Sequence, residues 1–167
     1  MRELRPIWPD APRYGPDEPF PPYRFVSGLH PHPVRDPKGH SYGRVKEADH
    51  VPADAFREDA DYLRGIDLYH AGYLWEAHEA WEGLWKAAID PVARDFYQGL
   101  IQLAASLIKA HQGHARGAER LADGARERFV RVAASHERYR GLELAALRSF
   151  GGRWEAAPRL EPVGSGS

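Results

Sequence analysis

The chain has 167 residues, 43% of them hydrophobic, a formal net charge of −1 and no cysteine. This length and composition suit one soluble domain with a buried core. The near-zero charge gives no general attraction for nucleic acid or anionic lipid, and the lack of cysteine excludes disulfide and thiolate chemistry. No apolar run is long enough for a bilayer, and "MRELRPIWPD" lacks a signal peptide's apolar segment, so we expect a cytoplasmic protein without a membrane partner.

Residues 1–52 contain eleven of the fourteen prolines. Proline fixes φ and lacks the amide donor, so regular helix or central strand is not expected there. Disordered tails are poor in aromatic residues, whereas this segment contains several. They are Trp8, Phe20, Tyr23, Phe25 and Tyr42. We therefore expect an extended N-terminal arm that packs onto the body, at least over 20–42.

Residues 53–157 have helical periodicity and predict an all-α domain, a compact antiparallel bundle of four to five helices. The expected helices cover 54–70, 73–88, 91–112, 116–136 and 142–150. Asp54 suits the first N-cap, Gly72 the end of that helix and Pro91 the first turn of the third. The connections are short, so neighbours should be antiparallel, and no segment alternates like a strand. Residues 158–167 are expected to be a tail that ends in a "GSGS" linker.

The second predicted helix carries ionisable residues on its apolar side. At about 100° per residue, His78 and Glu82 fall within the arc occupied by Trp81 and Trp85. Glu79 lies at the edge of that arc. Glu76 lies outside it and should be solvated. A buried carboxylate without partners costs several kcal/mol, so we expect Glu82 to be paired, hydrogen-bonded, protonated or bound to a cation.

Two interpretations of this helix remain open. His78 and Glu82 are one turn apart and could form a structural hydrogen bond. Alternatively His78, Glu82 and Glu79 are catalytic acid–base groups, or His78 and Glu82 bind a divalent metal. The run "HEAWE" differs from the zinc peptidase motif H-E-x-x-H in its last position, and a site with one imidazole and carboxylates suits manganese or iron better than peptidase zinc.

Two glutamines of the third predicted helix are expected to complete the site. In an antiparallel hairpin closed near Asp90, Gln102 would lie level with His78 and Gln98 level with Glu82. With Trp81 and Trp85 they are the candidate substrate-binding residues. The alternative is that Gln98 and Gln102 simply face water, as a polar stripe on an amphipathic helix does.

The arm holds a second set of metal-compatible side chains in "LHPHPVRDPKGHSYG". His30, His32 and His40 are the candidate ligands there. Docking of the proline-rich arm through its aromatic residues explains the stretch without a metal. We also expect the arm to close a pocket above His78 and Glu82, with Arg35 or Tyr42 available to an anionic ligand.

The runs "YHAGYLWEAHEAWEGLWKAA" and "RDFYQGLIQLAASLIKAHQGHARGAERL" resemble the bacterial and archaeal family called domain of unknown function 309. The resemblance covers about residues 58–150 and rests on four short motifs. These are His78-Glu79, Trp81-Glu82, the run from Gln98 to Gln102, and Gly117-Ala118. It implies a compact all-α bundle in which His78, Glu79, Glu82, Gln98 and Gln102 occupy the positions that define the family, and it supplies no reaction.

Two functions follow as hypotheses. The first is a small hydrolase or lyase acting on a small molecule, assisted by a divalent metal such as Mn, Fe or Zn. The alternative is a non-catalytic binding or dimerisation module, which five tryptophans and eight tyrosines favour. Nucleic-acid binding is not expected, because acidic residues interrupt the arginines of the fourth helix.

Overall fold

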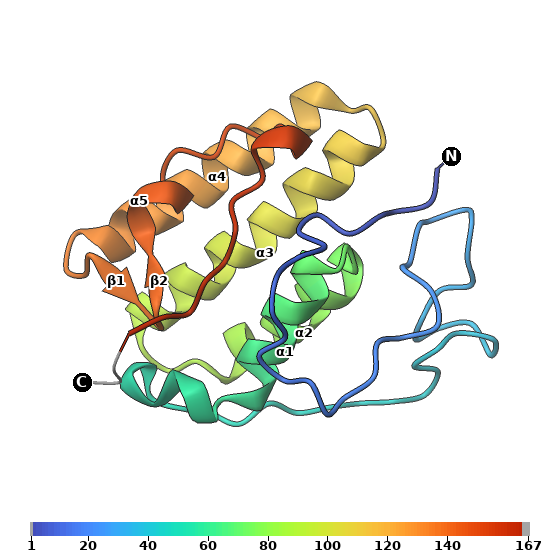
Figure 1. Ribbon diagram of the computed structural model, residues 1–167, viewed down its shortest axis with the longest axis horizontal. Coiled ribbons are helices and arrows are strands. Elements are labelled where there is room, and N and C mark those ends of the chain that lie inside the picture. The colour runs from blue at the N-terminus through green and yellow to red at the C-terminus, as the bar shows by residue number, and fades with distance from the viewer. Residues whose placement is uncertain (1, 165–167) are drawn as a thin grey trace.

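A computed structural model describes residues 2–164 of the chain. Four long helices pack into a bundle, as the sequence predicts, and the N-terminal arm lies across the side formed by the first two (Figure 1). The long helices are α1 (Ala60–His70), α2 (Leu74–Ala87), α3 (Pro91–His111) and α4 (Ala115–Ala133). In the described part of the chain no helix is both long and apolar enough to cross a bilayer.

The first predicted helix is in fact two elements. Residues Ala53–Glu58 form a 3-10 helix, η1, and Asp59 then leaves helical geometry with φ −86° and ψ 86°. The Asp59 carboxylate accepts a hydrogen bond from the Tyr62 amide at 3.1 Å, which satisfies one of the free donors of the first turn of α1. The N-cap is therefore Asp59 and not the expected Asp54. Gly72, at φ 84°, ends the α1 region as predicted.

The core lies between α1, α2, α3 and α4. Asp90 caps α3 by accepting from the Ala93 amide at 2.9 Å, and Pro91 occupies the first turn, where it removes no needed donor. Large fully buried side chains fill the centre of the bundle. They include Trp81, Tyr62, Tyr69, Tyr97, Phe96 and Phe129. Burial of this much apolar surface is the main stabilising contribution to the fold.

The predicted fifth helix over 142–150 is confirmed only as one short turn over 144–147. A two-strand hairpin, β1 (Arg138–Tyr139) with β2 (Leu142–Glu143), precedes a single helical turn, α5 (Leu144–Leu147), and a 3-10 turn, η2 (Trp154–Ala156). Arg140 and Gly141 both have positive φ, 48° and 78°, the geometry of a tight two-residue hairpin turn. A strand of two residues is too short to show the alternation by which strands are recognised in a sequence.

The arm packs on the bundle, as predicted, through its backbone. The amides of Tyr14 and Gly15 donate to the buried Asp67 carboxylate, both at 2.8 Å, and those of Ile7 and Trp8 donate to the carbonyl oxygen at the end of α1. The C-terminal segment also packs against the helices, and Leu160, within the expected tail, is buried. Residues 165–167 of the expected linker lie outside the described residues.

Candidate functional site

Helix α2 presents His78, Glu79 and Glu82 together at the surface. His78 Nδ1 lies 3.7 Å from a Glu79 carboxylate oxygen, and His78 Nε2 lies 4.0 Å from a Glu82 oxygen. One potential ligand atom from each residue lies within 4.8 Å of the other two. The structure therefore brings together all three residues that the sequence singled out as catalytic. We call His78, Glu79 and Glu82 the α2 cluster.

The α2 cluster is not the buried pair that the helical wheel predicted. The exposed fractions of the side chains are 27% for His78, 45% for Glu79 and 34% for Glu82. Glu82 also pairs with Lys86, whose Nζ lies 3.2 Å from Oε1. On the helical wheel these residues border the apolar arc, and the exposed fractions show that no element in the described part of the chain covers that border. Solvent can therefore reach the cluster, and Glu82 needs no proton or bound cation to be stable.

The two tryptophans of α2 do not share one environment. Trp81 is fully buried, and its indole lies directly against Gly65 of α1. Trp85 is half-buried, and the Arg94 guanidinium lies 4.3 Å from its ring centre. Trp81 thus has a packing role between α1 and α2, while Trp85 remains reachable from solvent.

Gln102 faces α4, and neither of the two glutamines lines the cleft beside the α2 cluster. Gln102 points toward α4, where a Cβ built on Gly124 would lie 2.7 Å from its Nε2. Gln98 is half-buried and, like Gln102, does not line the cleft described below. Helix α3 packs against both α2 and α4, and this determines which way Gln102 faces. The position of a residue along a helical hairpin gives its level relative to the other helix but does not determine which way its side chain faces.

The arm histidines are used separately and do not form a metal cluster among the described residues. His30 Nε2 lies 2.9 Å from Glu3, while its Nδ1 accepts from the Val26 amide. His32 Nδ1 accepts from the amides of Val34 and Arg35 and its ring packs against Trp75. Each of these rings stabilises a turn or a contact of the arm. This agrees with the interpretation that the histidine-containing stretch serves to dock the arm.

His40 instead contacts the carboxylate of Glu76, a residue that helical periodicity predicts to be solvated. Its Nε2 lies 2.9 Å from Glu76 Oε1, which also accepts from the Phe25 amide at 3.0 Å. The side chains of Glu76 and His40 are only 5% and 4% exposed. The prediction of a solvated Glu76 is wrong, because the arm covers this face of α2. No periodicity within α2 could have shown this.

A cleft of about 280 Å³ lies between the arm and the outer faces of α1 and α2. Its floor includes Glu76 and His40, and its apolar wall includes Trp75 and Leu68. Charged residues from both sides line it as well: Glu18, Arg44, Lys46, Asp61, Arg64 and Glu79. The arm therefore closes a pocket on α2, as expected, but above Glu76 and Glu79. His78 and Glu82 are not part of its lining.

The part of the chain that contains α2 and α3 matches a known sequence family. The profile described as "Domain of unknown function (DUF309)" matches residues 62–121, from the first turn of α1 into α4. Residues 62–121 are a DUF309 domain. No curated protein and no solved structure matches the chain in the corresponding comparisons.

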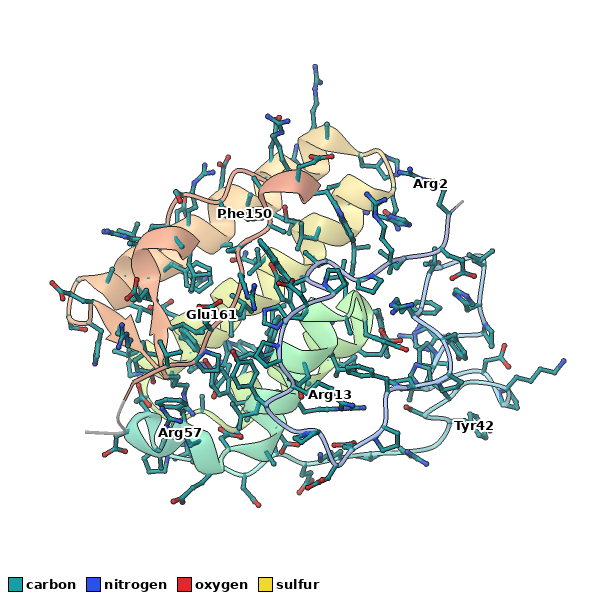
Figure 2. The ribbon with its side chains drawn as sticks, viewed as in Figure 1. Arg2, Arg13, Tyr42, Arg57, Phe150 and Glu161 are labelled. Atoms are coloured by element: carbon teal, nitrogen blue, oxygen red, sulfur yellow. The ribbon has the colours of Figure 1, made fainter. Side chains whose placement is uncertain are left out.

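The DUF309 domain supplies one wall of the cleft, and the arm outside it supplies the other. The match contains the α2 cluster, Glu76, Gln98 and Gln102. His40 and the other arm residues of the cleft precede it. Tyr42, one of the residues expected near an anionic ligand, points away from the helices at the outer edge of the arm (Figure 2). Arg35 is exposed and does not line the cleft.

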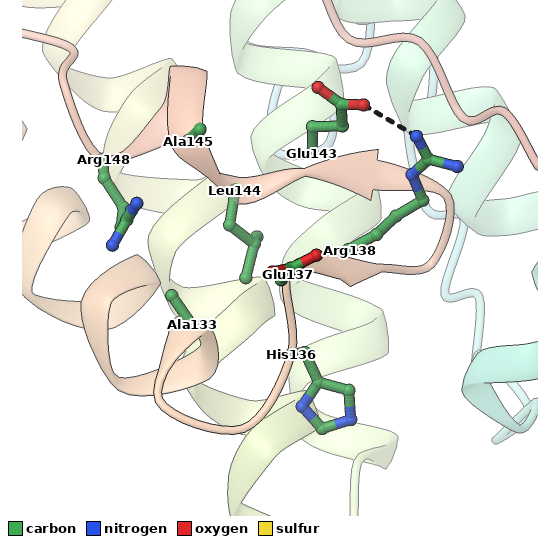
Figure 3. Close-up of a pocket in the computed structure, with 8 residues that line it drawn as sticks. All are labelled: Ala133, His136, Glu137, Arg138, Glu143, Leu144, Ala145 and Arg148. Atoms are coloured by element: carbon green, nitrogen blue, oxygen red, sulfur yellow. Dashed lines mark hydrogen bonds and ion pairs between the residues drawn. The ribbon is translucent and has the colours of Figure 1, made fainter.

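A larger hollow, of about 780 Å³, lies outside the DUF309 domain between the end of α4 and the hairpin (Figure 3). Most of its polar lining residues are exposed, and Arg138 pairs with Glu143 across the hairpin at 2.7 Å. Arg138 and Glu143 therefore form an ion pair with each other at the exposed surface. None of the described residues that line the hollow has a buried polar side-chain atom without a partner, so the cleft beside α2 is the better candidate site.

Proposed function

We propose that the α2 cluster binds a divalent cation and that this cation assists hydrolysis or elimination on a small molecule held in the neighbouring cleft. The observation that carries the proposal is the position of Glu79. Its carboxylate belongs to the α2 cluster, and the residue also lines the cleft. A cation held there would sit at the edge of a pocket of suitable size for a small substrate.

The donor types of the α2 cluster favour a first-row divalent ion. One imidazole nitrogen and carboxylate oxygens suit Mn²⁺, Fe²⁺ or Zn²⁺, and the remaining positions would be open to water or substrate. A cation in such a site polarises a bound oxygen or lowers the pKa of its bound water. Glu79, at the edge of the cleft, would then hold the cation next to the substrate.

Cation binding is tested by titrating the full chain with Mn²⁺ and measuring the bound ion by calorimetry or electron paramagnetic resonance. His78→Gln and Glu82→Gln should each weaken Mn²⁺ binding at least tenfold, since each removes a ligand. Glu119→Gln, an exposed carboxylate on α4, is the matched control and should not change the affinity. Lack of Mn²⁺, Fe²⁺ and Zn²⁺ binding at millimolar concentration would overturn the proposal.

The chemical step is tested with p-nitrophenyl phosphate and p-nitrophenyl acetate in the presence of Mn²⁺ or of EDTA. The proposal expects a part of the turnover that needs Mn²⁺, is absent in EDTA and falls in Glu82→Gln while the fold is intact. Mn²⁺ binding without any Mn²⁺-dependent turnover of either ester would restrict the α2 cluster to a cation site with no hydrolytic role.

Self-association through the arm is the second candidate function. Val45 is 90% exposed and Tyr42 is also largely exposed on the same segment of the arm. Large apolar side chains in contact with water often mark a partner surface. Size-exclusion chromatography with light scattering should then give a dimer that Val45→Ser converts to a monomer, and a wild-type monomer would contradict this candidate.

A further inference from the structure

A continuous hydrogen-bonded chain joins Ser41, His40 and Glu76 at the cleft. Ser41 Oγ lies 2.8 Å from His40 Nδ1, and His40 Nε2 lies 2.9 Å from Glu76 Oε1. All three residues line the cleft between the arm and α2. A hydroxyl, an imidazole and a carboxylate in this order form the arrangement that activates a serine nucleophile.

The Glu76 carboxylate determines which atom donates and which accepts in each of these hydrogen bonds. An ionised Glu76 only accepts hydrogen bonds, so His40 Nε2 must carry the proton and donate it. In the neutral imidazole, Nδ1 is then the acceptor, and the Ser41 hydroxyl donates to it. Nδ1 is therefore the basic atom, and it already faces the hydroxyl that it would deprotonate.

The arm holds His40 rigidly. The His40 amide donates to the Tyr23 hydroxyl at 3.1 Å, and that hydroxyl donates to the Pro31 carbonyl at 2.8 Å. The Tyr23 ring also packs against the imidazole, with 4.7 Å between ring centres. Next to it, the Ser41 amide donates to the Pro33 carbonyl at 2.9 Å. A base whose orientation is fixed before substrate binds is what nucleophilic catalysis requires.

Two features of the cleft suit an acyl substrate. The volume of about 280 Å³ and the apolar wall of Trp75 and Leu68 can hold a short acyl chain. Arg44 lines the same cleft and makes no ion pair within residues 2–164, in contrast to Lys46, which pairs with Asp61 at 2.5 Å. The Arg44 guanidinium is thus the cation free to stabilise an oxyanion.

We propose that Ser41 is the nucleophile of an acyl-transfer site that hydrolyses short-chain carboxylic esters, with His40 as its base and Glu76 as the positioning residue. Ser41 Oγ attacks the acyl carbon, and its proton passes to His40 Nδ1. That proton then passes to the departing alcohol oxygen as the ester C–O bond breaks. Water hydrolyses the acyl-serine by the same steps, so ester and water give acid and alcohol. This site needs no cation and is separate from the proposed function of the α2 cluster.

Covalent labelling tests the nucleophile directly. The full chain is incubated with a fluorophosphonate in EDTA, and the adduct is measured by intact mass and located by peptide mapping. A reactive serine displaces fluoride from phosphorus, so one adduct is expected, on Ser41. Ser41→Ala should abolish it, whereas Ser27→Ala, at an exposed serine of the same arm, should leave it unchanged.

Kinetic measurements distinguish the proposed positioning role of Glu76 in catalysis from a purely structural role. Glu76→Gln keeps an oxygen that can accept from the Phe25 amide but loses the negative charge beside His40. We expect the labelling rate and the kcat for p-nitrophenyl acetate to fall at least tenfold, with unchanged KM and circular dichroism. Both rates are measured in EDTA, and Glu119→Gln, at an exposed carboxylate on α4 outside both sites, should leave them unchanged.

Absence of an adduct from folded protein, or an adduct on another serine, would overturn the proposal. Equal ester hydrolysis by Ser41→Ala and wild type in EDTA would do the same. If Glu76→Gln labels as fast as wild type, the chain from Ser41 to Glu76 is only an attachment of the arm, and the proposal also fails. Mn²⁺ affinity should not change in Ser41→Ala, so the cation proposal is judged independently.

Discussion

His70 Nε2 accepts a hydrogen bond from the Leu160 amide at 3.0 Å, which ties the end of α1 to the C-terminal segment. Because Nε2 accepts, the ring is neutral and carries its proton on Nδ1, a buried atom with no hydrogen-bond partner in the described part of the chain. Burial, and secondly the nearby Arg159, lower the pKa of His70 from 6.5 to about 4, although Asp10 acts in the opposite direction.

This pKa predicts an acid-sensitive fold. Between pH 6.5 and about 4 the unfolded chain binds a proton at His70 that the folded chain does not, so the free energy of unfolding falls as the pH is lowered through this window. The contribution is fully present above pH 6.5, and its loss at pH 4 is about 3 kcal/mol. Urea unfolding at several pH values measures it. His70→Gln, which keeps an acceptor but does not titrate, should lack this slope, and a wild-type slope in that variant would refute the assignment.

A buried ion pair joins the start of α1 to the hairpin. Arg140 lies 3.2 Å from the Asp59 carboxylate, and both side chains are almost fully buried. Burial raises the pKa of Asp59 despite the opposing effects of the Tyr62 amide and Arg140, so desolvation of this pair is costly. Asp59→Asn keeps the N-cap and leaves the Arg140 charge without its partner. We expect a loss of about 3 kcal/mol in the free energy of unfolding.

The matched control for the ion pair is on the same hairpin. Glu143→Gln removes an exposed partner of Arg138 and should change the free energy of unfolding by less than about 0.5 kcal/mol. Similar losses from Asp59→Asn and Glu143→Gln in chemical denaturation would show that burial does not determine the strength of these contacts.

Gly65 allows α1 and α2 to approach closely. A Cβ at this position would overlap the indole of Trp81, which is fully buried. Gly65→Ala should therefore lower the free energy of unfolding by about 2 kcal/mol, even though alanine favours helix. Thermal and urea unfolding measure the change. Gly151→Ala should be close to neutral, because no described atom beyond the two chain neighbours lies within 4 Å of the added carbon.

Lys86 competes with any cation bound at the α2 cluster. Its ammonium group lies 3.2 Å from Glu82 Oε1, so a metal ion must displace it or share the carboxylate. Lys86→Gln should strengthen Mn²⁺ binding about two- to fivefold, a modest gain because the pair is exposed. Lys109→Gln, on α3, should have no effect. Weaker Mn²⁺ binding by Lys86→Gln would show that Lys86 does not oppose the cation.

Much of the architecture is determined by local sequence. The helices α2, α3 and α4 lie within a few residues of their predicted bounds, because apolar periodicity, Pro91 and Gly72 act on neighbouring residues. The aromatic residues of the arm also indicated that it would pack on the bundle. The hairpin was missed because its strands have only two residues each, and the positive φ of Arg140 depends on the contacts that the hairpin makes.

Helical spacing alone places His78, Glu79 and Glu82 on one side of α2, so their grouping follows from local sequence. Which ionisable groups are buried depends on the contacts between elements. Glu76 is buried because His40, 36 residues earlier in the chain, lies over it. Glu82 is 34% exposed because no element within residues 2–164 covers that edge of the helix. Helical periodicity describes one element at a time, whereas burial depends on what folds back against it.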